Sequence, residues 1–268
     1  MKRVEVMEFE DQSWFPSWLR SCMTNNIVVM ARFLGVRHAL SSLLSTALQK
    51  TGARSVVDLG SGAGGVMPEV IGTLQEQPEF SEVRLTLTDK YPNLPAASVF
   101  NASENGTVSY CEESIDATTL NSAPAGLKTM VNCFHHMNPT QARSILASAV
   151  EKREPILIYE MAGHQTPPFP VWLLFLPIGL VMVFLMAFVK SAFVRPFTPQ
   201  QAIFTYAIPL IPLFYAWDGQ ASMPRIYRLE DYDTLLEGLE SESYTWERGF
   251  GQSKRGGKLG SYVLGMPT

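Results

Sequence analysis

A glycine-rich loop that follows a short apolar run is the feature of this sequence with the clearest chemical meaning. Residues 55–59 read SVVDL, residues 60–65 read GSGAGG, and residues 66–75 have apolar side chains at helical spacing. Glycine is required where a strand turns sharply into a helix and a ligand approaches the backbone, because any side chain would occupy the ligand's place. The segment therefore predicts a strand, a tight nucleotide-binding loop and a helix.

Acidic residues lie at the ends of predicted strands. Asp58 directly precedes the glycine loop, where its carboxylate is expected to face the ligand and to suit an ammonium group. Asp89 ends the run at residues 83–88, and an acid there can accept hydrogen bonds from both hydroxyls of a ribose. The glycines also satisfy the G-x-G-x-x-G spacing of dinucleotide-binding folds, so these residues by themselves leave NAD open as the ligand.

The order of four motifs is more specific. DLGSGAG, TD, IDA and VNCFHHM follow one another along residues 58–137, and this order resembles a class I S-adenosylmethionine-dependent methyltransferase over residues 52–162. The resemblance implies S-adenosyl-L-methionine as the cofactor. It assigns cofactor-binding roles to seven residues, which are Asp58, Gly60, Gly62, Gly64, Asp89, Asp116 and Cys133.

The resemblance also implies what each residue does. The three glycines line the methionine part of the cofactor, and Asp58 organises contacts to its amino group. Asp89 holds the ribose hydroxyls, Asp116 hydrogen-bonds the adenine amino group, and Cys133 lies beside the reactive methyl. Lys90 departs from the family pattern, because an apolar residue often lies beside the adenine at that position.

His135, His136 and Glu160 are the candidate catalytic residues. Methyl transfer from a sulfonium is an in-line displacement that mainly requires alignment, while a hydroxyl acceptor must also lose a proton to a base. If residues 130–137 stay extended, one histidine must point away from the site, and His135 is preferred on family position. Glu160 ends the run at residues 156–160, where open α/β sheets bind ligands.

Apolar runs that alternate with helical patterns predict the fold. Two helices at residues 17–34 and 37–49 precede the glycine loop, and a Gly-Gly turn near the C-terminus indicates an antiparallel hairpin. We expect a doubly wound, Rossmann-like α/β fold with a mostly parallel sheet, N-terminal helices and a hydrophobic helical insertion. Further strands are expected at residues 83–88, 107–111, 129–134, 156–160, 244–250 and 261–264, and further helices at residues 141–151 and 229–239.

Residues 166–222 differ in composition from the rest of the chain. They contain only three charged residues, and the uncharged run at residues 171–189 would span about 28 Å as a helix, close to the ~30 Å hydrocarbon core of a bilayer. If both flanks join one sheet, the chain crosses the membrane either twice or not at all. The alternative is a buried helical pair in a soluble protein or at a dimer interface. Because the segment after the fifth strand commonly builds the acceptor pocket in this family, a lipophilic acceptor is expected, with Asp218, Arg225 and Tyr227 as substrate-binding candidates.

Composition excludes several classes of function. A net charge of -4 without a basic cluster argues against nucleic acid as a partner, and three scattered cysteines indicate neither a disulfide framework nor a metal site. Acids within the first 15 residues argue against a secretory signal. We therefore expect a membrane-associated methyltransferase with a cytoplasmic catalytic domain; the alternatives are a soluble acceptor, a non-catalytic nucleotide-binding scaffold, or an NAD-binding reductase. The expected division is 1–51 (helical cap), 52–165 (cofactor core), 166–222 (insertion) and 223–268 (closing elements).

Overall fold

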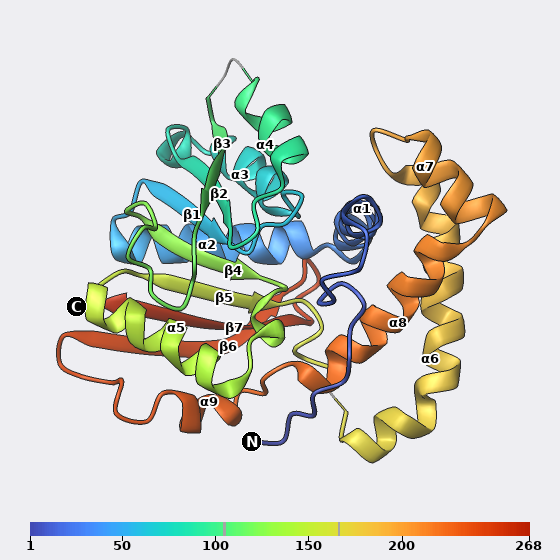
Figure 1. Cartoon of the computed structure of the whole chain (residues 1–268). Coiled ribbons are helices and arrows are strands. Elements are labelled where there is room, and N and C mark those ends of the chain that lie inside the picture. Colours follow the sequence, from blue (N-terminus) through green and yellow to red (C-terminus); the bar gives the residue numbers. More distant parts are fainter. Residues whose placement is uncertain (104–105, 166) are drawn as a thin grey trace.

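The computed structural model describes residues 1–103, 106–165 and 167–268, and these residues form one seven-stranded sheet (Figure 1). The strand order is β3-β2-β1-β4-β5-β7-β6; β1 to β5 run parallel, and β7 pairs antiparallel with both β5 and β6. The predicted mostly parallel sheet with a closing hairpin is therefore confirmed. The strands are β1 (Ser55–Leu59), β2 (Arg84–Asp89), β3 (Val108–Ser114), β4 (Leu127–Val131), β5 (Ile156–Glu160), β6 (Tyr244–Gln252) and β7 (Lys258–Pro267).

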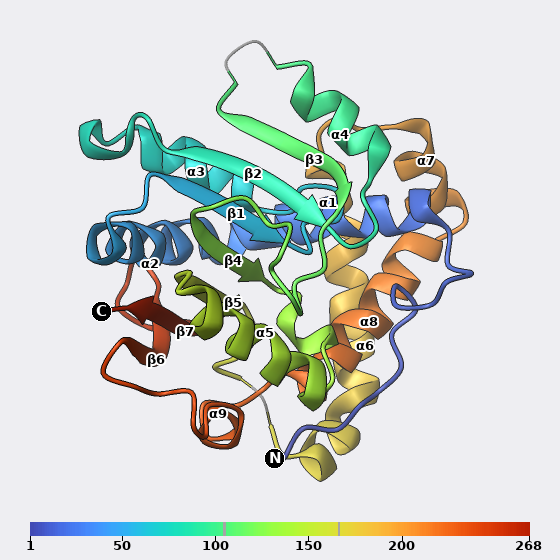
Figure 2. The same cartoon turned by 60° about the vertical axis from the view of Figure 1, so that its left-hand side comes forward.

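Helices cover both faces of the sheet (Figure 2). Successive residues of a strand point to opposite faces, so in β5 Leu157 and Tyr159 join one core, whereas Ile156 and Ile158 join the other. This double burial explains why β1 and β5 read as continuous apolar runs. The first core packs on α2 (Val36–Thr51), α3 (Met67–Gln75) and α4 (Leu94–Asn101), and the second on α5 (Pro139–Lys152) and α9 (Asp231–Leu235).

The hydrophobic insertion forms two long helices that lie side by side, α6 (Phe169–Lys190) and α8 (Leu210–Arg225), with the short α7 (Pro199–Ala202) near their turn (Figure 1). α8 contacts α1 (Ser17–Leu34), which lies beyond the carboxyl ends of the strands, between the sheet and the helix pair (Figure 1). A third core cluster joins these helices. The insertion therefore packs next to the edge of the sheet where ligands bind in open α/β folds.

Among the described residues, one helix is long and apolar enough to cross a membrane, Phe169–Phe193, with a mean hydropathy of 2.6. Only 11% of its most apolar 18-residue stretch is buried. The helices α1 and α2 are long and apolar enough only when they are taken together, and they bend by 85° at Gly35. Length and composition therefore identify α6 as the membrane candidate.

Several element boundaries differ from the sequence prediction. The strand expected at residues 129–134 ends at Val131, because Phe134–His136 form a 3₁₀ turn. The helix expected at residues 229–239 is the short α9. A second apolar run, residues 203–217, contains Pro209 and Pro212, which predict an interruption, and Ile203–Ala207 form a π-helical turn that is separate from α8. Proline is tolerated in the first turn of a helix, where its missing N–H has no intrahelical partner, so Pro212 fits near the start of α8, directly after the N-cap residue Pro209.

Candidate functional site

The glycine loop between β1 and α3 has a backbone that side chains disfavour. Gly60, Gly62, Gly64 and Gly65 have φ values of 73°, 53°, 107° and 54°, all in the left-handed region. A Cβ at Gly64 would lie 2.7 Å from the ring of Phe100, whereas a Cβ at Gly62 would meet no atom within 4 Å. Gly64 is therefore needed for packing, and Gly62 faces open space from which a ligand can approach.

Asp58 shapes this loop from inside the protein. Its carboxylate accepts hydrogen bonds from the hydroxyls of Ser61 and Thr129, each at 2.7 Å, and the residue is 4% exposed. The expectation that this carboxylate faces the ligand is therefore corrected, because both oxygens are directed into the loop and the neighbouring strand. Burial raises the pKa of Asp58 to about 7, although the two hydroxyls counteract this.

Asp89 connects the end of β2 to the glycine loop. One carboxylate oxygen accepts a hydrogen bond from the backbone N–H of Gly62 and the other from that of Tyr91, both at 2.8 Å. Burial raises the pKa of Asp89, and these backbone N–H groups oppose the rise. The structure thus brings together the residue predicted to hold the ribose and an open glycine of the loop.

Asp116 lies at the end of β3 with its carboxylate already engaged. One oxygen accepts hydrogen bonds from the backbone N–H and the hydroxyl of Thr118, and the other lies 2.7 Å from the Lys90 ammonium. Lys90, which departs from the family pattern, thus forms an ion pair with Asp116, the residue predicted to bind the adenine. This contact is the main reason that the pKa of Asp116 falls to about 2. A bound adenine would have to share this carboxylate with the lysine.

The ends of β4 and β5 bring the candidate catalytic residues together. Nδ1 of His135 lies 2.8 Å from Oε2 of Glu160, and the backbone N–H of His135 donates to Oε1 of the same residue. Because residues 134–136 form a 3₁₀ turn, the rings of His135 and His136 lie with centroids 4.2 Å apart. One histidine is expected to point away only if the backbone stays extended, and the 3₁₀ turn removes that condition.

Cys133 lies over the start of the glycine loop. Its Sγ is 3.3 Å from the carbonyl oxygen of Leu59, and a Cβ added to Gly60 would be 3.2 Å from that sulfur. Burial raises the pKa of the Cys133 thiol. The ends of β1, β4 and β5 thus meet at the edge where the motif order predicted the site.

The N-terminal segment, residues 1–15, covers this edge and was missed by the sequence reasoning. Nδ1 of His136 lies 2.8 Å from Oδ1 of Asp11 and 3.0 Å from Oε2 of Glu8, while its Nε2 is 3.5 Å from Glu10. Three acids within four residues were the available signal, but the sequence does not show which histidine they meet. These carboxylates raise the pKa of His136 well above its ordinary value against the effect of burial.

Two of the three substrate-binding candidates, Asp218 and Arg225, hold the N-terminal segment in place. Asp218 accepts hydrogen bonds from the backbone N–H groups of Phe9 and Glu10, at 2.8 and 3.0 Å. Nη1 of Arg225 lies 2.6 Å from Asp11, and the Tyr227 hydroxyl donates to the carbonyl of Met137. The polar groups of all three residues contact the protein itself. A substrate role for them stays a prediction that requires the segment to move.

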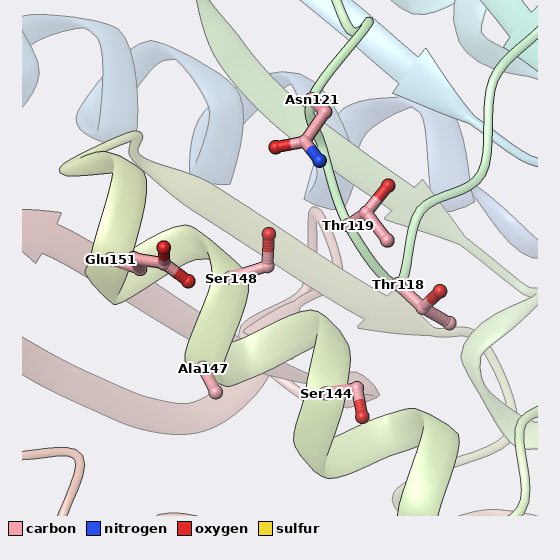
Figure 3. A pocket seen from close by; sticks show the side chains of 7 residues that line it. All are labelled: Thr118, Thr119, Asn121, Ser144, Ala147, Ser148 and Glu151. Carbon is pink, nitrogen blue, oxygen red and sulfur yellow. The ribbon is translucent and has the colours of Figure 1, made fainter.

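A pocket of about 310 Å³ lies elsewhere, between α5 and the loop that follows Asp116 (Figure 3). None of the predicted site residues lines it. The lining residues are Thr118, Thr119, Asn121, Ser144, Ala147, Ser148 and Glu151. The pocket is therefore separate from the candidate site at the carboxyl ends of β1, β4 and β5.

No protein-family model and no curated protein matches this chain. Among solved structures, the plantazolicin methyltransferase BamL, in complex with a triazolic desmethylPZN analog and SAH, aligns with a TM-score of 0.49 at 14% identity, over 93% of this chain and 97% of BamL. TnmH aligns at 0.47 and 18% identity over 89% of this chain. The mitomycin 7-O-methyltransferase MmcR aligns with a TM-score of 0.48 at 14% identity over 89% of this chain. The chain spans about half the length of TnmH and MmcR, 55% and 54%. At these identities the likeness concerns the fold alone.

Proposed function

We propose that this protein transfers a methyl group from S-adenosyl-L-methionine to a lipophilic small molecule or lipid at a membrane surface. One observation carries the proposal. The open glycine loop, tied to Asp89 through Gly62, meets Cys133 and the His135–Glu160 pair at one edge of the sheet. A nucleotide-binding loop and a base within one edge are the parts that methyl transfer to a hydroxyl requires.

The residues at the loop fit this cofactor. Gly62 leaves room for a ligand against the backbone, and Asp89 offers carboxylate oxygens beside it. When bound, S-adenosylmethionine supplies an electrophilic methyl on a sulfonium. The same glycines and acid would also suit NAD, so the order of the motifs and the base at the end of β4 favour the methyl donor.

His135 is the residue that we assign to proton removal from the acceptor. Glu160 accepts a hydrogen bond from the N–H at Nδ1, which fixes the tautomer and leaves Nε2 to accept a proton from the acceptor. Nε2 lies 4.0 Å from Oε1 of the buried Glu8. The acceptor therefore reaches Nε2 only when residues 8–11 are displaced.

The exposed apolar face of α6 supports the membrane part of the proposal. A broad stripe of large side chains along this helix is turned outward, comprising Leu174, Phe175, Ile178, Val181, Met182, Leu185 and Val189. A contiguous face of this kind on a soluble domain is typical of a membrane or protein contact. α8 is tied to the body through Asp218, so we propose that α6 lies in the membrane interface on the cytoplasmic side and does not cross.

Calorimetric titration tests the cofactor. The protein in mild detergent is titrated with S-adenosylmethionine, S-adenosylhomocysteine and NADH. The titrations are repeated with Asp89→Asn and with the control Asp233→Asn, which removes the same charge from a surface carboxylate. Binding of the first two ligands that is lost only in Asp89→Asn supports the proposal. Binding of NADH alone would favour an NAD-binding reductase instead. Binding of none of the three ligands would favour a non-catalytic nucleotide-binding scaffold. Methylation of water-soluble compounds without lipid would favour a soluble acceptor.

A further inference from the structure

Imidazole and carboxylate groups from three distant parts of the chain gather at the carboxyl ends of β4 and β5. Glu8, His135 and His136 each offer one ligand atom, and these atoms all lie within 4.8 Å of one another. Oδ1 of Asp11 is 2.8 Å from Nδ1 of His136 and so belongs to the same group. Two histidine nitrogens with carboxylate oxygens are a typical ligand set for first-row divalent transition metals.

Glu8 is the feature of this cluster that its own partners do not satisfy. The residue is 0% exposed, and within the described residues neither carboxylate oxygen has a partner in hydrogen-bond geometry. Nη1 of Arg225 and Nδ1 of His136 lie 3.0 Å from Oε2, and Nε2 of His135 lies 4.0 Å from Oε1. Burying a carboxylate oxygen without a hydrogen bond is costly, so a cation bound beside Oε1 would stabilise Glu8.

The orientation of His135 fits metal binding. Its Nδ1 is held by Glu160 at 2.8 Å, so Nε2 points toward Glu8. Metal-binding histidines usually donate their other ring N–H to a carboxylate, which fixes the ring and the tautomer. Glu160 already accepts this hydrogen bond from His135.

The charge of the cluster also favours a cation. Four carboxylates, those of Glu8, Glu10, Asp11 and Glu160, contact the two imidazoles, and the guanidinium of Arg225 contacts two of the four. Metal binding requires neutral imidazoles, and the carboxylates then outnumber the guanidinium four to one; without a metal, a proton on His136, whose pKa is raised, offsets part of this excess. One divalent ion would neutralise most of this excess and would leave the histidine nitrogens free to bind it.

We propose that Glu8, His135 and His136, with Asp11 beside them, form a binding site for a first-row divalent transition-metal ion such as Zn²⁺. The nitrogen ligands favour this class over Mg²⁺ and Ca²⁺, which prefer oxygen ligands. The ion would tie the N-terminal segment to the ends of β4 and β5. While bound it would also occupy Nε2 of His135, so metal binding and proton removal by that nitrogen exclude each other. The site does not depend on which cofactor the glycine loop holds.

Metal binding to the full chain tests the proposal. Protein without a polyhistidine tag is stripped with a chelator and titrated calorimetrically with Zn²⁺ and with Mg²⁺, and Co²⁺ is followed by its visible absorption. We expect one equivalent of Zn²⁺, a Co²⁺ spectrum with nitrogen ligands, and a melting temperature raised by roughly 5 °C at saturating Zn²⁺. Glu8→Gln and His136→Gln should each weaken binding by roughly tenfold or more.

Matched controls separate the site from adventitious binding. Glu5→Gln changes an exposed acid of the same segment, and His38→Gln removes an exposed imidazole elsewhere; both should bind Zn²⁺ like the wild type. Circular dichroism of the metal-free variants checks that they fold. No stoichiometric Zn²⁺ binding by the wild type, unchanged binding by both ligand variants, or equal affinity for Mg²⁺ would each overturn the proposal. Titration of the same samples with S-adenosylmethionine separately tests the proposed function.

Discussion

Replacing Asp58 by asparagine should flatten the pH dependence of stability between about pH 5 and pH 8. In the folded protein, burial raises the pKa of this carboxyl to about 7, whereas an unfolded chain gives aspartate a pKa of about 3.9. The folded state therefore keeps the proton over a pH range in which the unfolded state has lost it. The stabilising contribution is complete below about pH 4 and is lost as the pH rises to about 7.

The size of the effect follows from linkage. Each pH unit between the two pKa values lowers the free energy of unfolding by about 1.4 kcal/mol, and the loss levels off above the folded value. From about pH 5 to pH 8 this amounts to roughly 2.5 kcal/mol for Asp58 alone. Asparagine carries no proton to lose, and its amide can accept from Thr129 and donate to Ser61, so the loop should keep its shape.

Urea unfolding followed by circular dichroism measures this contribution. Wild type and Asp58→Asn are compared at about pH 5 and pH 8, and the variant should gain roughly 2.5 kcal/mol on the wild type between the two conditions. Asp233→Asn, which removes a charge from an exposed ion pair with Arg248, is the control and should follow the wild type. If the wild type and Asp58→Asn have the same pH dependence, the buried carboxyl does not titrate in this range and our account of the loop is refuted.

Three further substitutions test the loop, the base and the membrane face. Gly64→Ala should destabilise the protein by about 1–3 kcal/mol in urea unfolding, because its Cβ meets an aromatic ring at 2.7 Å and φ is 107°; Gly72→Ala, where no atom lies within 4 Å, should not. Glu160→Gln should lower kcat roughly 10²-fold while leaving the affinity for S-adenosylhomocysteine unchanged, and a parallel loss of that affinity would mean misfolding. Met182→Lys, on a side chain 65% exposed, should reduce flotation with lipid vesicles about tenfold. Equal flotation of Met182→Lys and of Val99→Lys, at a 71% exposed side chain on α4, would exclude α6 as the membrane contact.

The sequence by itself determined the order of the elements and the edge of the sheet that carries the site. Both follow from local patterns: β-branched runs buried on two faces form the parallel strands, and glycines with left-handed φ form the loop after β1. Asp89, Cys133, His135 and Glu160 meet because the carboxyl ends of parallel strands lie at one edge. No contact between distant residues had to be known for these predictions.

Only the tertiary structure decided what the polar side chains at that edge do. A single hydrogen bond of Asp58 to Thr129 spans 71 positions, and the pairing of His136 with Asp11 spans 125. The 3₁₀ turn after β4 also turns both histidines to one side, which no periodic pattern predicts. The acids of the N-terminal segment meet Arg225 and the histidines because the segment folds back over the sheet edge. Such partners are chosen by proximity in the folded chain, and the residue types by themselves leave many pairings open.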